Sequence, residues 1–171
     1  PKLINEAQQL FKDQKFEESK NLFEKLLGMD SNNTKILLGF IRCLIQLKRF
    51  EEAREMFDSF DDSLVNNDEI SKIKKLLDNS SNKDVSSLNK LIEEVKMNPQ
   101  DKGLRYSLAE SYLSANETEK GFNELLKLFA QDPSWNNDAA KKKMLEFFDL
   151  LGFNDPNVAV ARKKLSSLMF K

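Results

Sequence analysis

The sequence contains no histidine and a single cysteine, and both shortages narrow the chemistry open to this chain. Without histidine it lacks the commonest general base and the commonest metal ligand in proteins. The lone Cys43 cannot form an internal disulfide or a CxxC pair, which fits a reducing, cytoplasmic compartment. No glycine-rich phosphate loop of the GxxxxGK or GxGxxG kind occurs either. We therefore predict that the protein is not an enzyme and binds no cofactor or metal.

Long apolar runs, glycine and proline are also scarce. No apolar run approaches the ~18 residues of a membrane span, and five glycines and four prolines leave little room for long irregular loops. The net charge of −1 over 171 residues provides no overall field to attract nucleic acid or acidic lipid. The charge is uneven, because residues 136–171 hold seven Lys/Arg against four Asp/Glu. We expect protein partners, with no nucleic acid and no membrane.

What the sequence does contain is repeated helical periodicity. Apolar side chains recur at helical spacing in residues 3–11, 16–27, 37–47 and 50–60, with short polar breaks between them. The stretches KFEESKNLFEKL (15–26) and RFEEAREMFDSF (49–60) repeat one pattern. In this pattern the aromatic Phe16 and Phe50 align, and so do the small Ser19 and Ala53. The first four helices therefore form two hairpins, because stacked copies of a hairpin bury a face that one copy leaves exposed.

The same period continues along the chain, but unevenly. Two further steps from Ala53 reach Ser87 and Gly121, both small. The fit is good around Gly121 and poor in residues 66–99, where DNSSNKD (78–84) replaces a tight turn and the second helix is expected from Val85 to Lys96. Residues 136–171 leave the register. There we predict a helix that ends at Gly152, followed by one that begins at Pro156.

A helix–turn–helix period of about 34 residues resembles the tetratricopeptide repeat (TPR), in which a small residue lies where the second helix of a unit packs on the first. The resemblance implies an all-α, right-handed solenoid of about ten antiparallel helices. We expect four hairpins in residues 1–135, with a degenerate third unit at 66–99. A helical pair in residues 136–171 caps the C-terminal end. The whole forms one continuous domain.

A sharper resemblance covers about the whole chain and is most specific from Asn98 to Phe170, through NPQDKGLRYSLAESYLSANETEKGFNELLKLF and DPSWNNDAAKKKMLEFFDLLGFNDPNVAVARKKLSSLMF. These stretches look like the C-terminal region of bacterial thioredoxin–TPR co-chaperones of the YbbN (CnoX) type. The chain departs from that family because no thioredoxin-like domain and no redox CxxC pair precede Pro1, so we expect the helical half alone. The resemblance implies a cytoplasmic holdase that binds unfolding clients and passes them to the GroEL or DnaK folding machinery.

Side chains of the first helix of each hairpin line the concave groove of a TPR stack. Projecting the family's groove positions onto this sequence identifies eleven candidate partner-binding residues: Ile4, Gln8, Phe11, Lys35, Leu38, Arg42, Ile45, Gln46, Tyr106, Glu110 and Leu113. Packing between neighbouring units is the alternative role for the apolar Phe11, Ile45 and Leu113. A Lys–Asn–Arg clamp for C-terminal carboxylates is not expected, because Ile4, Gln8 and Gly39 occupy three of its positions.

Three further features complete the predictions. The basic residues Arg162, Lys163 and Lys164 mark a candidate docking site for the folding machine, although a solvated cap is the simpler role for this tail. Cys43 lies among apolar residues and is expected to be buried and inert. Trp135 is expected to pack at the junction between the repeats and the tail. The alternative to a co-chaperone is a structural assembly module, or a scaffold that forms a homodimer through the groove.

Overall fold

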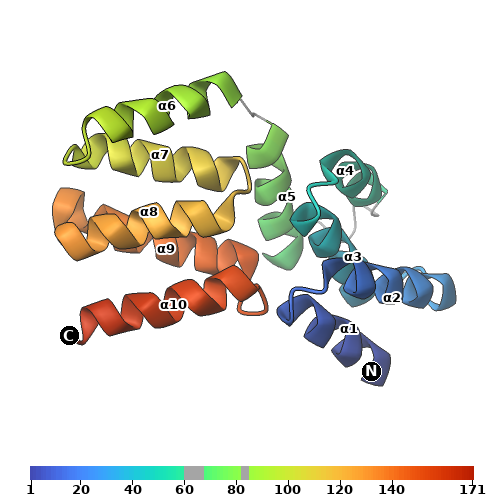
Figure 1. Cartoon of the computed structure of the whole chain (residues 1–171). Helices are drawn as coiled ribbons and strands as arrows, with labels where there is room; N and C mark the ends of the chain where they lie inside the picture. The colour runs from blue at the N-terminus through green and yellow to red at the C-terminus, as the bar shows by residue number, and fades with distance from the viewer. Residues whose placement is uncertain (60–67, 82–84) are drawn as a thin grey trace. The chain divides into compact units, whose positions relative to one another are not determined.

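The computed structural model describes residues 1–59, 68–81 and 85–171, and these residues form ten helices and no strand, which confirms the all-α class (Figure 1). Where the described chain is continuous, short turns join consecutive helices, and neighbours in the sequence pack together from α1 to α4 and from α6 to α9. The helices are α1 (Lys2–Lys12), α2 (Phe16–Met29), α3 (Thr34–Gln46), α4 (Phe50–Asp58), α5 (Asp68–Ser81), α6 (Val85–Met97), α7 (Lys102–Ser114), α8 (Thr118–Gln131), α9 (Trp135–Leu151) and α10 (Pro156–Met169).

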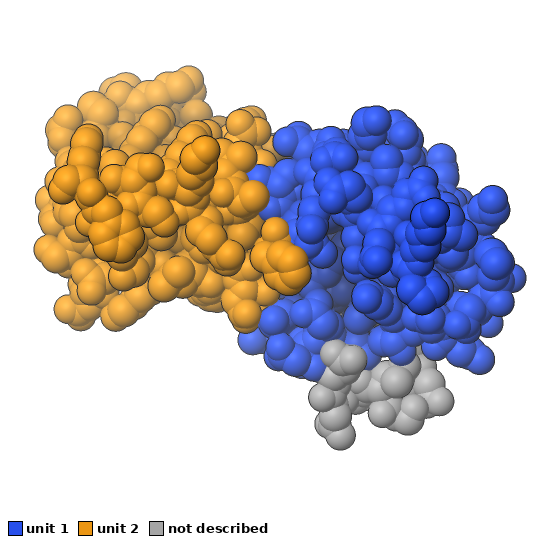
Figure 2. All heavy atoms as spheres, turned by 90° about the horizontal axis from the view of Figure 1, so that it is seen from below, with its two compact units in different colours: residues 1–81, 154–156 blue, residues 82–153, 157–171 orange. Residues whose placement is uncertain are grey.

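The chain divides into two compact units (Figure 2). Unit 1 comprises residues 1–81 and 154–156, and unit 2 comprises residues 82–153 and 157–171. In unit 1 the helices pack in sequence order, with α5 against α3 and α4; in unit 2, α6, α7, α8 and α9 pack in the same successive way. The two helices of the expected third hairpin, α5 and α6, therefore belong to different units. The expected division at residue 135 within one continuous domain stays a prediction.

Helix termini follow the polar breaks of the sequence. Asn33 caps α3 by accepting a hydrogen bond from the Ile36 amide at 3.3 Å, and Asp101 caps α7 by accepting one from the Leu104 amide at 3.0 Å. Two repeat lengths separate these two caps. Each satisfies an amide that would otherwise have no partner in the first turn of its helix. Local capping thus starts the first helix of a hairpin in both units.

Small residues lie buried where the second helix of a hairpin crosses the first. Ser19 and Ala53 are both 0% exposed, and the Ser19 hydroxyl donates a 2.7 Å hydrogen bond to the carbonyl oxygen of Ala7. In unit 2, a Cβ atom at Gly121 would meet the Leu113 side chain at 2.7 Å and the Ala109 carbonyl oxygen at 3.3 Å. The repeated small position therefore permits close contact between paired helices.

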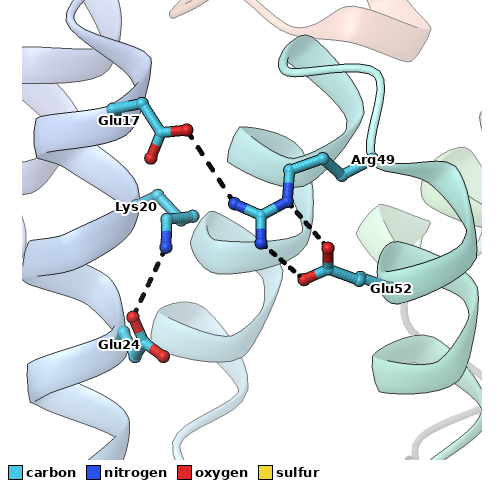
Figure 3. A network of polar contacts seen from close by, with 5 residues as sticks. All are labelled: Glu17, Lys20, Glu24, Arg49 and Glu52. Carbon is cyan, nitrogen blue, oxygen red and sulfur yellow. Dashed lines mark hydrogen bonds and ion pairs between the residues drawn. The ribbon is translucent and has the colours of Figure 1, made fainter.

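A polar network joins α2 to the start of α4 (Figure 3). Arg49, at the end of the α3–α4 turn, makes two 2.8 Å hydrogen bonds to Glu52 and lies 3.8 Å from a Glu17 carboxylate oxygen on α2. The pKa of Arg49 rises above its ordinary value, chiefly because of the bonds to Glu52. Lys20 pairs with Glu24 along α2 at 3.5 Å. Water screens pairs between exposed side chains, so the Arg49 pairs contribute little to folding stability.

Two segments differ from the sequence prediction. α5 continues to Ser81, so residues 78–81 of the expected Ser/Asn-rich turn are helical, while residues 82–84 and Phe60 lie outside the described residues. At the start of α9, three successive residues have left-handed backbone angles, with φ of 49°, 57° and 62° at Asn136, Asn137 and Asp138. Asn and Asp tolerate this conformation better than other non-glycine residues. Regular right-handed helix therefore begins only at Ala139.

The contact between Gly39 on α3 and Phe23 on α2 allows a test of the packing. A Cβ atom on Gly39 would lie within 2.9 Å of three Phe23 ring carbons, and Phe23 is only 1% exposed, so the ring has little room to move. Gly39→Ala should lower the free energy of unfolding by about 1–2 kcal/mol, because overpacking outweighs the helix-propensity gain. Chemical denaturation followed by circular dichroism measures the change.

Gly28→Ala is the matched control, because a Cβ atom there meets nothing within 4 Å. This variant should be stabilised by up to about 1 kcal/mol through helix propensity alone. Equal stability changes in the two variants would show that Gly39 is not needed for close packing.

Candidate partner-binding surfaces

The candidate partner-binding residues of unit 1 lie on α1 and α3, and they separate by burial. The buried ones are all apolar and at most 8% exposed: Phe11, Leu38 and Ile45. Phe11 packs edge-on against Phe16, with ring centroids 5.2 Å apart. The ones that remain accessible to solvent are Ile4, Gln8, Lys35, Arg42 and Gln46. A partner therefore meets a mainly polar surface here, and the buried apolar side chains act in the core of the unit.

Arg42 and Gln46 already have partners inside unit 1. The Arg42 guanidinium lies 2.8 Å from a Glu69 carboxylate oxygen, which links α3 to α5. Lys72 pairs with Asp68 at 3.1 Å and with Glu69 at 3.7 Å. The Gln46 side-chain amide donates a 2.6 Å hydrogen bond to Asp155, whose carboxylate is buried. These contacts fix the side chains in place before any partner arrives.

In unit 2 the candidate residues lie on α7, where Leu113 is buried while Tyr106 and Glu110 are partly exposed. The Tyr106 ring packs against Trp135 with centroids 5.5 Å apart and planes tilted by 52°. This contact confirms the expectation that Trp135 packs where the tail begins. Burial raises the pKa of Tyr106 above its ordinary value, so its hydroxyl, which is neutral at physiological pH, stays neutral further into the alkaline range.

Lys143 is a functional candidate that the sequence did not single out. Its ammonium lies 3.5 Å from a Glu110 oxygen on α7 and 3.2 Å from a Glu146 oxygen on α9. Burial acts to lower the pKa of Lys143, but the hydrogen bond to Glu146, the Tyr106 hydroxyl and both carboxylates outweigh it and raise that pKa. In sequence the residue belongs to the run Lys141–Lys143, which is typical of a solvated helix edge. Lys143 differs from its neighbours in this run because the fold places it beside Glu110 of α7.

Arg42 and Glu110 occupy the same position of the repeat, since two repeat lengths separate them. Each forms an ion pair with a later helix of its own unit, Arg42 with α5 and Glu110 with α9. The sign of the charge at this repeat position differs between the units, because unit 1 has a cation there and unit 2 has an anion. The two surfaces are thus built alike but differ in charge.

The basic tail residues Arg162, Lys163 and Lys164 are all exposed on α10. The opposite face of this helix buries Val158, Ala161 and Leu165, which are at most 4% exposed. The Arg162 guanidinium lies 5.5 Å from the centroid of the Phe148 ring on α9, within cation–π range. The exposed large apolar residues of α10 and its end are Val160, Met169 and Phe170. The outer face of α10 therefore combines positive charge with apolar surface.

Cys43 is fully buried, as predicted. Its thiol donates a 3.3 Å hydrogen bond to the Ser19 hydroxyl, which in turn donates to the Ala7 carbonyl. Burial raises the pKa of Cys43 to about 11, although the bond to Ser19 acts in the opposite direction. A thiol with so high a pKa carries almost no thiolate near neutral pH, which makes it a poor nucleophile.

The described residues hold no group of three or more Cys, Asp or Glu side chains that could bind a metal ion. Within the same described residues, no helix is both long enough and apolar enough to cross a membrane.

Comparison with known proteins identifies the family to which the chain belongs. Two family models, each described as tetratricopeptide repeat, match residues 81–170 and residues 10–77. The chain belongs to the tetratricopeptide repeat family. No curated protein matches the sequence. Among solved structures, the chain is similar to a domain of protein VP0806 from Vibrio parahaemolyticus, of unknown function, with a TM-score of 0.52, 19% identity and 96% coverage of each chain.

Membership confirms the predicted helical-repeat fold, and TPR folds typically serve as protein-binding scaffolds rather than enzymes. At 19% identity, the Vibrio domain shows a shared fold alone. The roles of the eleven candidate residues and of the basic tail remain predictions.

The buried thiol gives a pH prediction. Because the folded-state pKa of Cys43, about 11, lies above its ordinary value of 9.0, the stabilisation that it contributes is complete below pH 9 and is lost as the pH rises towards 11. The stability of the wild type should therefore fall by up to about 2–3 kcal/mol more than that of Cys43→Ala between about pH 8 and about pH 11. Urea denaturation at both pH values measures this difference. Parallel losses in the two proteins would contradict the assignment.

Proposed function

We propose that this TPR domain is the helical half of a bacterial, cytoplasmic co-chaperone of the YbbN (CnoX) type. In this role it binds unfolding clients and links them to the GroEL or DnaK folding machinery. Two observations support the proposal. The chain is a TPR protein, and the stretch from Asn98 to Phe170 resembles the C-terminal region of that co-chaperone family.

Clients bind along the first helices of the hairpins. In unit 1 the accessible residues mix the apolar Ile4 and Leu3 with polar side chains such as Gln8, so an extended segment finds both apolar contact and hydrogen bonds. Each client side chain that is fully buried contributes roughly 1.5–3 kcal/mol. A few such contacts give the weak, sequence-tolerant binding that a holdase needs.

The observation that carries the docking half of the proposal is the outer face of α10. Residues 156–171 hold four Lys/Arg and no Asp or Glu. Among the described residues, Lys163 and Lys164 form no ion pair, and they lie within one helical turn of Val160, which is 51% exposed. A helix that only capped the stack would present polar groups on this face. Its mixture of charge and apolar surface suits an acidic, partly apolar patch on another protein.

Charge reversal on α10 tests the docking half. Lys163→Glu/Lys164→Glu should weaken binding to purified GroEL or DnaK by at least about fivefold, because like charges then face the acidic patch. Lys74→Glu/Lys75→Glu is the matched control, since both lysines are exposed on α5 and the net charge changes equally. Biolayer interferometry measures both variants. Equal weakening in the two, or no binding by the wild type, would rule out docking through α10.

Client binding is tested separately. The wild-type domain should suppress aggregation of chemically denatured citrate synthase at a near-stoichiometric ratio, as measured by light scattering. The α10 double variant should protect as well as the wild type, because clients bind the hairpin surfaces rather than α10. A domain that protects no client would instead favour the assembly-module or homodimer alternative, and sedimentation analysis would then distinguish these two.

A further inference from the structure

A surface of unit 2, apart from α10, has residues suited to binding a side chain of another protein. It combines two aromatic rings with two carboxylates, and we name it the Tyr106 surface. Its members come from α7 and α9, and they are Tyr106, Glu110, Trp135, Lys143 and Glu146. No member is fully buried. The surface includes two of the candidate partner-binding residues of α7.

The five side chains form one connected group. Tyr106 and Glu110 are four residues apart on α7 and therefore lie on the same helix face. Lys143 and Glu146 are three apart on α9, and Lys143 bridges to Glu110 at 3.5 Å. The charges of Lys143, Glu110 and Glu146 all act on the Tyr106 hydroxyl. Trp135 completes the group through its ring contact with Tyr106.

The two glutamates retain capacity to bind a cation. Lys143 approaches each through its Oε2 atom, at 3.5 Å for Glu110 and 3.2 Å for Glu146, and no described residue donates a hydrogen bond to either Oε1 atom. The Lys143 side chain is 19% exposed, whereas Glu110 and Glu146 are 44% and 55% exposed. The lysine is therefore more buried than the two carboxylates, which remain partly accessible to water. With two glutamates and one lysine, the surface keeps a net charge of −1.

We propose that the Tyr106 surface binds an arginine side chain of a partner polypeptide, at the solvent-accessible edges of the Glu110 and Glu146 carboxylates and beside the Tyr106 and Trp135 rings. This inference rests on the proposed role of the chain as a protein-binding scaffold, and it names the partner chemistry for unit 2. A guanidinium suits the site better than an ammonium. It donates several hydrogen bonds in one plane, so it can bond two carboxylates, and its flat face stacks on aromatic rings.

Trp135 is the only tryptophan of the chain, so its fluorescence reports directly on this surface. Titration of the full chain with an acetylated tetra-arginine peptide should produce a saturable change in tryptophan emission. A tetra-lysine peptide of equal charge should bind at least about threefold more weakly, because it lacks the planar donors. A tetra-citrulline peptide, which is similar in shape but neutral, should produce no saturable change.

Glu110→Gln/Glu146→Gln should weaken tetra-arginine binding by at least about fivefold, because both charged acceptors are lost. Glu93→Gln/Glu119→Gln is the matched control, since both glutamates are exposed on other helices of unit 2 and the net charge changes equally. The control should bind like the wild type. Circular dichroism should show equal helix content in all three proteins. Equal weakening in both variants, or equal affinity for tetra-arginine and tetra-lysine, would refute the arginine site.

The outcome is separable from that of the proposed function. If Glu110→Gln/Glu146→Gln leaves tetra-arginine binding unchanged while the wild type still protects clients, the arginine site is wrong and the scaffold role stands. If the wild type protects no client and binds neither folding machine, but selects tetra-arginine through Glu110 and Glu146, the arginine site stands and the co-chaperone role is wrong.

Discussion

The close approach of paired helices at a small residue is the contact on which the rest of this structure depends. Ser19 meets the backbone of Ala7 through a 2.7 Å hydrogen bond, and the bare Gly121 leaves space for the backbone of Ala109 and the Leu113 side chain. Three repeat lengths separate Ser19 from Gly121, and the same interval separates Ala7 from Ala109, so one contact recurs in both units. A larger residue would force the helices apart and expose the apolar faces that they share.

This contact also determines which side chains remain available for binding. Ala7 and Ala109 face the second helix of their hairpins. The residues that follow them, Gln8 and Glu110, therefore point about a quarter turn away from that contact. At that position the chain places Arg42 in one unit and Glu110 in the other, each paired with a later helix. Ordered pairs of this kind reduce the entropy lost on binding, and their opposite polarity lets one repeat fold select different partners.

Much of the fold could be predicted because its signals are local. Apolar spacing, the short polar breaks between apolar stretches, and Gly152 before Pro156 predicted the helices, and the structure shows Asn33 and Asp101 capping two of them. The role of Lys143 could not be predicted, since a lysine in a basic run becomes half-buried only through a helix remote in sequence. The left-handed residues Asn136–Asp138 escaped prediction for a related reason: their side chains suit a helix start as well as a reversed turn.

The tail shows why a cap and a binding surface are compatible on one helix. Val158, Ala161 and Leu165 are buried along one side of α10, which is the packed side of this amphipathic helix. The residues on the outer side of α10 do not pack in the core. Solubility is then the only requirement on their composition. Lys163 and Lys164 favour solubility because they are charged. Val160 is exposed on the same helix but is apolar, so it does not favour solubility. Apolar surface retained beside solubilising charge is characteristic of a face that a partner covers for part of the time.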